Sequence, residues 1–163
     1  VEGFNLGNSP FHYMNKNLFG KEVVLTTTNG TRAISVAKNS HQIIVGSFLN
    51  LTAICNYLKN EKRDVLLLCA GWRGRFNLED SLFAGAVVNE LSGDFFNELS
   101  DSALAAQTFY EVGKNDIGNF LINSSHRRRL KNLNLEKDIN YCLQFDQTKV
   151  VPILEGSRLI PVK

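Results

Sequence analysis

The sequence has little of what marks secreted, membrane-spanning or nucleic-acid-binding proteins. It holds only three cysteines, Cys55, Cys69 and Cys142, and their odd number and wide spacing argue against a disulfide scaffold or a cysteine metal site. No apolar run is long enough to cross a bilayer. Residues 1–5 contain no basic segment followed by an apolar one, so no signal peptide is expected. We therefore expect a cytoplasmic protein that makes no use of a membrane.

Charge of one sign is also scarce. The formal net charge is +2 over 163 residues, which is too close to balance to indicate nucleic-acid binding. The hydrophobic share of 44% and the charged share of 21% are those of an ordinary globular domain. We expect residues 1–163 to form a single domain with its own core. A small anionic partner is compatible with this composition.

The order of apolar segments predicts an α/β fold. Short β-branched or apolar runs alternate with helical patterns, which favours parallel strands joined by helical crossovers. Asn50 is a plausible N-cap for the second helix, and Pro152 and Pro161 suit strand edges. Strands are expected at 23–27, 42–47, 64–71, around 141–145 and around 150–154, and helices at 31–38, 50–58, 81–91, 102–110 and 124–130.

The turn between the first expected strand and helix is the first candidate site. Ligands of α/β sheets bind beyond the carboxyl ends of the strands, where a helix N-terminus offers unpaired N–H groups. Gly30 permits a tight or positive-φ turn, and Arg32 can add a bidentate guanidinium. In the alternative interpretation, Thr28 and Asn29 only cap the helix and Arg32 faces solvent. The residues proposed to hold an anion are Thr27, Thr28, Asn29, Gly30, Thr31 and Arg32.

A second candidate follows the third expected strand. Cys69 and Gly71 end that strand at the same sheet edge, and Glu79 and Asp80 begin the next helix. Adjacent carboxylates beside an anion site are suitable ligands for Mg²⁺. Two plainer interpretations stay open: the carboxylates only favour the helix N-terminus, and Cys69 is a small buried hydrophobe.

Two further groups have less specific patterns. Asn8 and Ser9 offer an amide and a hydroxyl on a turn, although plain turn chemistry explains them equally well. The basic run 127–129, with His126 beside it, is most simply a solvated helix face.

The order of these motifs resembles the 2-phosphosulfolactate phosphatase (ComB) family. The matching segments are residues 3–10, 26–32, 46–50, 69–71, 78–80 with 84–85, 125–130, and 138–139 leading to 151–152. Together these segments extend over nearly the whole chain, and their order and spacing make the resemblance fairly specific. Members of that family begin with a longer N-terminal segment, so the resemblance implies that residues 1–163 are the larger, C-terminal part of such a protein.

The resemblance implies a three-layer α/β/α sandwich around a mixed, largely parallel sheet. It also implies a Mg²⁺-dependent hydrolysis of 2-phosphosulfolactate to 3-sulfolactate and phosphate, with coenzyme M biosynthesis as the role in methanogens. We assign catalysis to Arg32, Cys69 and Asp80, substrate binding to the turn residues with Asn8, Ser9 and Gly71, and Mg²⁺ to Glu79 and Asp80. The attacking group is water or the Cys69 thiolate. A non-catalytic anion-binding module is the alternative function, and a homo-oligomer is possible.

Overall fold

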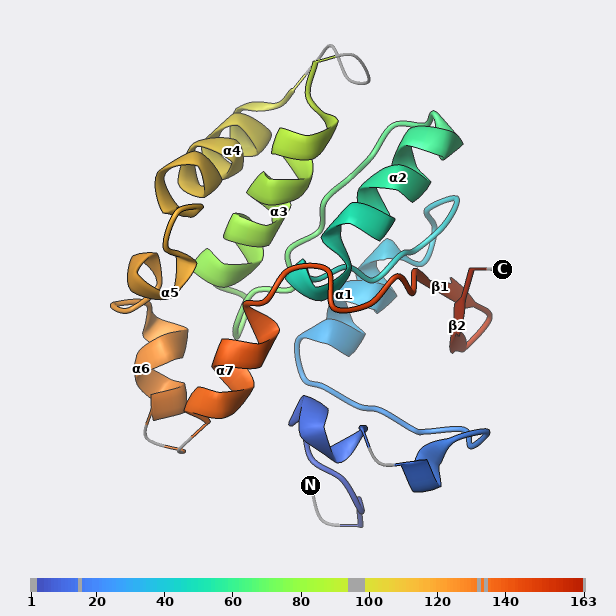
Figure 1. Ribbon diagram of the computed structural model, residues 1–163. Coiled ribbons are helices and arrows are strands. Elements are labelled where there is room, and N and C mark those ends of the chain that lie inside the picture. The colour runs from blue at the N-terminus through green and yellow to red at the C-terminus, as the bar shows by residue number, and fades with distance from the viewer. Residues whose placement is uncertain (1–2, 15, 94–98, 132, 134, 163) are drawn as a thin grey trace.

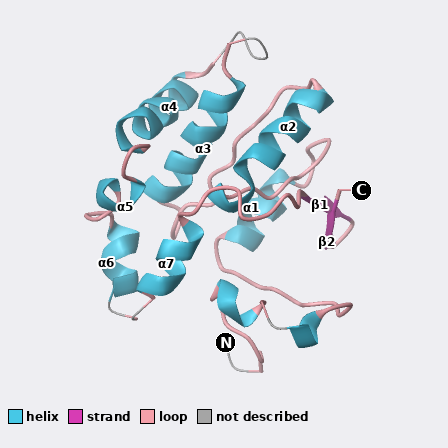
Figure 2. Cartoon of the chain, in the orientation of Figure 1, coloured by secondary structure: helices cyan, strands magenta, loops and turns pink. Residues whose placement is uncertain are grey.

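The computed structural model of the chain describes residues 3–14, 16–93, 99–131, 133 and 135–162 (Figure 1). Within these residues, helices account for most of the regular structure, and the only named strands form one hairpin (Figure 2). The α-helices are α1 (Gly30–Ala37), α2 (Leu51–Glu61), α3 (Leu78–Leu91), α4 (Asp101–Gly113), α5 (Ile117–Phe120), α6 (Ser125–Lys131) and α7 (Glu136–Cys142). Short 3-10 helices are η1 (Pro10–His12), η2 (Lys16–Leu18) and η3 (Phe48–Asn50), and the strands are β1 (Pro152–Glu155) and β2 (Arg158–Pro161).

The core forms around α3. This helix packs against α2 on one side and α4 on the other, as Figure 1 shows. Apolar side chains occur all round α3, which is the pattern of a helix covered by neighbours on several sides. Leu82 and Val87 have no exposed surface, and Cys55 of α2 is only 2% exposed. The buried thiol of Cys55 has a pKa raised to about 12, chiefly because burial disfavours the thiolate.

Gly85 allows α3 and α4 to approach closely. A Cβ atom at this position would lie 1.9 Å from the carbonyl oxygen of Ala106 and 3.0 Å from the side chain of Tyr110. Backbone cannot give way as a flexible side chain can, so the helices would have to separate.

Replacing Gly85 with alanine is therefore expected to lower the free energy of unfolding by about 1–3 kcal/mol. Urea titration followed by circular dichroism measures this change. The matched control is Gly118→Ala in α5, where the atom nearest to the new methyl group would be 3.6 Å away. The control should leave stability unchanged or slightly raised, because alanine favours helix. Equal stability of Gly85→Ala and the native chain would contradict the close packing.

The helices predicted from the pattern are confirmed, but one cap is not. The amide oxygen of Asn77 caps α3 by accepting from Glu79 N at 2.9 Å. Asn50 makes no side-chain cap for α2. Instead the Asp146 carboxylate accepts from Thr52 N at 2.8 Å and from Thr52 Oγ1 at 2.7 Å, while Asn50 Nδ2 donates to Val150 O at 2.9 Å. A residue far along the chain thus caps the helix, which a local pattern cannot reveal.

The expected sheet is only partly formed. Pro152 begins β1 and Pro161 ends β2, and these two residues pair in the antiparallel register. Segment 42–47 contributes one isolated bridge, Ile44 to Ile153. Segments 23–27 and 64–70 carry no strand or bridge assignment in the structure. The chain is thus a mixed helical and strand fold, compatible with the α/β class, and the three-layer sandwich with a parallel sheet is not confirmed.

The prediction of a strand around 141–145 is wrong. Residues up to Cys142 belong to α7, and Ile139 packs into the core as a helical residue. The aromatic and apolar residues that suggested a strand lie at and beyond the helix end. Here the tertiary packing of one helical face decides the structure over local β propensity.

Among the residues that the structure describes, no helix is both long and apolar enough to cross a membrane.

Candidate functional site

The threonine-rich turn leads directly into α1, as predicted, but its details differ. Gly30 is the first helical residue and does not have a positive φ. A Cβ atom there would lie 2.6 Å from Thr27 Oγ1, so a larger residue would require the Thr27 side chain to rotate, and Gly30 is not needed for backbone freedom. The hydroxyl of Thr31 donates to Thr27 O, and Asn29 makes no side-chain cap. The turn is therefore locked by its own hydrogen bonds, and Thr31 Oγ1 is engaged in them.

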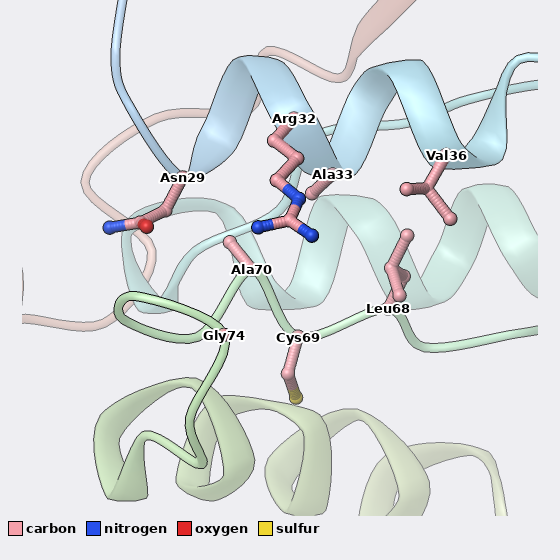
Figure 3. Close-up of a pocket in the computed structure, with 8 residues that line it drawn as sticks. All are labelled: Asn29, Arg32, Ala33, Val36, Leu68, Cys69, Ala70 and Gly74. Atoms are coloured by element: carbon pink, nitrogen blue, oxygen red, sulfur yellow. The ribbon is translucent and has the colours of Figure 1, made fainter.

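Arg32 projects from α1 over the loop that ends the third expected strand. In Figure 3 its guanidinium lies above Ala70 and faces the loop at Gly74. A small cavity of about 110 Å³ is formed between α1 and this loop. Among the described residues, no carboxylate lies within 4.0 Å of the Arg32 guanidinium. Arg32 is an exposed residue whose donors are available to a ligand, so its position fits both the anion-binding and the solvent-facing interpretation. The residues that line the cavity are Asn29, Arg32, Ala33, Val36, Leu68, Cys69, Ala70 and Gly74.

A tight turn at residues 72–75 forms the floor of this site. Trp72 and Arg75 exchange both backbone hydrogen bonds, each at 3.0 Å. Arg73 has a φ of 53°, and its backbone N–H donates to Asn29 Oδ1 at 3.2 Å. Asn29 therefore joins the start of α1 to this turn. The two segments proposed from the sequence, 26–32 and 69–71, are brought together as predicted.

Asp80 holds the same loop by a hydrogen bond. Its Oδ2 accepts from Gly71 N at 2.7 Å. Burial raises the pKa of the Asp80 carboxyl, the Gly71 hydrogen bond opposes that rise, and the nearby Glu79 adds to it. Gly71 has a φ of 66° and a Cβ there would lie 2.5 Å from Arg75 O, so only glycine suits this position. Asp80 is thus a desolvated carboxylate next to the Arg32 loop.

Cys69 lines the cavity but directs its sulfur away from Arg32. Figure 3 shows the thiol pointing towards α3. The residue as a whole is exposed, yet desolvation at the sulfur raises the pKa of the Cys69 thiol, and the Asp80 carboxylate adds to the rise. A hydrogen bond with Ser81 opposes the shift without cancelling it. A thiol in this environment stays protonated at neutral pH, which is the opposite of an activated nucleophile.

Glu79 faces a different set of groups from Asp80. One carboxylate oxygen pairs with His126 Nδ1, and the other accepts from Ser124 Oγ at 3.4 Å. The two adjacent carboxylates therefore have separate partners. Within the described part of the chain, no group of three or more His, Cys, Asp or Glu residues is placed to hold a metal ion. That Glu79 and Asp80 share Mg²⁺ stays a prediction.

The sequence pattern predicts a solvated helix face for the basic run 127–129, and Arg128 and Arg129 are exposed, but the same helix makes contacts that the pattern does not predict. His126 contacts Glu79, and the Arg129 guanidinium lies 4.9 Å from the centroid of the Trp72 ring. Arg73 stacks on the same ring at 4.6 Å. The two contacts made by α6 join this helix to Trp72 in the loop and to Glu79 at the start of α3. They could not be found from spacing, because the partners lie 47 positions (126 less 79) and 57 positions (129 less 72) apart.

Other predicted site residues lie outside the cavity. Asn8 and Ser9 precede η1, where Tyr13 donates to Gly7 O at 2.8 Å and Phe11 packs against Tyr141 of α7. Thr27 and Thr28 are exposed at the entrance to α1 and do not line the hollow. Whether these four residues contact substrate stays a prediction.

Comparison with known proteins shows the family of the chain. A family model described as 2-phosphosulpholactate phosphatase matches residues 1–157. Proteins named "Probable 2-phosphosulfolactate phosphatase" are similar to the chain: the one from Thermotoga maritima is 48% identical over 94% of this chain and 65% of its own length. The one from Caldanaerobacter subterraneus is 35% identical over 96% of this chain and 65% of its own length.

These relatives are longer than the chain, which spans 65% of each of the two. The match nevertheless includes every segment that builds the site, from the Arg32 helix to α6, since the family model matches residues 1–157. The chain belongs to the 2-phosphosulfolactate phosphatase family.

Proposed function

We propose that the chain carries the phosphate-binding part of a phosphatase that hydrolyses 2-phosphosulfolactate, or a similar small phosphate monoester, to the alcohol and phosphate. The observation that carries the proposal is the Arg32 guanidinium, which faces a loop held by Asp80 and has no carboxylate partner among the described residues. The names of the relatives supply the substrate. Phosphoryl transfer depends mainly on positioning and charge neutralisation, which such a loop provides.

Arg32 would hold the phosphate by a bidentate, charge-assisted contact that strengthens as negative charge develops on the transferring group. The backbone of residues 69–74 would limit how the ester can turn. Water would be the attacking group, and Asp80, with its raised pKa, is the carboxylate nearest this loop that can accept a proton.

Magnesium remains part of the proposal through Asp80. Mg²⁺ commonly binds to one or two carboxylates together with the substrate's phosphate. Asp80 fits that role better than Glu79, because both Glu79 oxygens have partners in α6 or just before it. When bound, the ion would neutralise charge on the phosphoryl oxygens.

Cys69→Ser is expected to retain activity within about threefold, because a protonated thiol turned towards α3 does not attack the phosphate. Steady-state phosphate release from 2-phosphosulfolactate measures this. Cys142→Ser, a second exposed cysteine, is the control for the loss of a thiol. A fall of roughly 100-fold or more confined to Cys69→Ser would instead establish the covalent route.

The proposed function is tested by phosphate release from 2-phosphosulfolactate, with and without Mg²⁺, for this chain and for the full-length Thermotoga maritima relative. Turnover by both supports the proposal. Turnover by the relative alone, with phosphate still bound by this chain, would identify residues 1–163 as an anion-binding module that needs further residues for chemistry. The separate partners of Glu79 and Asp80 favour that second candidate.

The three-layer sandwich is proposed for the longer family members. Val24 is 79% exposed and Leu66 is 87% exposed, so the extended segments that carry them display apolar faces suited to strand neighbours. The remaining expectations are proposals as well. The three free cysteines suit a cytoplasmic location, the substrate is a small anion, and the exposed apolar segments are compatible with a homo-oligomer.

A further inference from the structure

A second, larger cavity lies beside the Arg32 site. It measures about 340 Å³, within the range of small-molecule sites, compared with about 110 Å³ for the first. The two hollows share the turn at residues 72–75, because Gly74 lines the first while Trp72 and Arg75 line the second. The remaining lining residues of this larger hollow, which we call the α6 cavity, are Phe76, Asn77, Ser125, His126 and Arg129.

The α6 cavity is cationic. Arg75 and Arg129 line it, and Arg73 stacks on the Trp72 ring that forms part of its wall. In the described part of the chain, none of these arginines has a carboxylate within 4.0 Å. The nearby acidic group, Glu79, is already paired with His126. The described residues therefore do not neutralise the positive charge of the cavity.

Two of the three guanidinium groups, those of Arg73 and Arg129, stack on one ring, although all three arginines are exposed residues. Arg129 lies 4.9 Å and Arg73 lies 4.6 Å from the centroid of the Trp72 ring. Stacking of this kind restricts a flexible side chain while leaving its N–H groups available for hydrogen bonds. The ring itself belongs to the turn closed by the two hydrogen bonds between Trp72 and Arg75. Restricted guanidinium groups bind anions at a lower entropic cost than mobile ones.

We propose that the α6 cavity is a second anion subsite, in which Arg75 and Arg129 bind the sulfonate or carboxylate of a substrate whose phosphate is held at Arg32. The proposal rests on the proposed function and adds to it the selection of substrates with two or more acidic groups. The shared turn would place both ends of such a molecule on one rigid support. Arg75 and Arg129 are then specificity residues, with no part in the phosphoryl transfer.

Titration calorimetry of this chain with 3-sulfolactate and, separately, inorganic phosphate tests the subsite without requiring turnover. The double variant Arg75→Gln/Arg129→Gln should weaken 3-sulfolactate binding at least tenfold and change phosphate binding less than twofold. Arg32→Gln should show the reverse pattern. The control Arg63→Gln/Arg158→Gln removes the same charge from distant ion-paired positions and should change neither affinity.

Three results would overturn the subsite: no binding of 3-sulfolactate to the native chain, unchanged binding in the Arg75/Arg129 variant, or an equal loss of phosphate affinity. Retained phosphate binding in the same variant shows that it is folded. If neither this chain nor the full-length Thermotoga maritima relative hydrolyses 2-phosphosulfolactate, the proposed function is rejected, while loss of 3-sulfolactate binding in the Arg75/Arg129 variant would still support the subsite. Turnover of 2-phosphosulfolactate, together with unchanged 3-sulfolactate binding and unchanged KM in the Arg75/Arg129 variant, would support the proposed function and reject the subsite.

Discussion

Arg32→Ala is expected to lower kcat/KM for phosphate release by about 100- to 1,000-fold, the usual cost of removing a group that stabilises developing charge. The guanidinium faces the cavity between α1 and the loop at Ala70, and no described carboxylate lies within 4.0 Å of it. Removing the Arg32 guanidinium should therefore weaken ligand binding and catalysis and leave folding unchanged. Because α1 contains no buried residue, the melting temperature should change little.

Three comparisons make the Arg32 result specific. Arg32→Lys keeps the charge but removes the fork, so it should recover only part of the activity. Arg63→Ala, at an exposed ion pair near the end of α2, should be fully active. Titration with inorganic phosphate should show weakened binding in Arg32→Ala. Unchanged phosphate affinity together with native turnover would remove Arg32 from the site.

The helices could be predicted from the sequence because their signals are local. The run from Leu82 to Leu91 is mostly apolar and long enough for a buried helix, and Glu79 and Asp80 mark its first turn. The strands could not be judged in the same way. A β-branched run such as residues 23–27 becomes a strand only when a neighbour supplies hydrogen-bond partners, and the described residues supply none there.

The location of the site is more predictable from the sequence than its chemistry. The structure brings Arg32 and Cys69 to one cavity and joins Gly71 to Asp80 by a hydrogen bond. Their proximity is predictable because an extended segment that ends near a helix start is a local signal. Side-chain direction is not predictable in this way. Nothing local in the sequence turns the Cys69 sulfur to α3 or engages Thr31 with the Thr27 carbonyl.

The contacts made by α6 are the main feature of the site that the sequence pattern does not predict. Arg128 and Arg129 are exposed as the pattern predicts, but a helix of seven residues has no strong periodic signal that would reveal the contacts it makes. Trp72, the one tryptophan, is the contact that gives Arg129 a fixed place, and it lies in a turn 57 positions earlier (129 less 72). A lone tryptophan next to two arginines, Arg73 and Arg75, is the clue that the sequence offers.

The turn at residues 72–75 explains why site and stability are linked. It lines both cavities, accepts support from Asp80 through Gly71 and is joined to α1 through Asn29. Keeping an ionised carboxylate desolvated beneath this turn costs stability, because burial disfavours the charged form. A residue retained at such a cost is a candidate for function.

Asp80→Asn is accordingly expected to lower kcat/KM by about 100-fold or more while raising the melting temperature at pH 7. The folded-state pKa of Asp80 lies above its ordinary value of 3.8. Its stabilising contribution is therefore complete below pH 3.8 and is lost as the pH rises through the folded pKa. Asparagine carries no charge at either pH and still offers an oxygen to Gly71 N. Its stability gain should thus be present at about pH 7 and shrink towards about pH 4.

Differential scanning calorimetry between about pH 4 and pH 8, together with phosphate-release rates, tests both parts of the Asp80 prediction. Asp64→Asn, an exposed aspartate at the start of the same extended segment, is the matched control and should change neither activity nor the pH dependence of melting. Phosphate release by the native chain should fall on the acid side, because only the ionised Asp80 is competent as a base or as a Mg²⁺ ligand. A variant that is inactive but melts lower than the native chain at pH 7 would show that Asp80 holds the loop structurally. A variant that melts higher yet keeps full turnover would show that its charge has no part in the reaction.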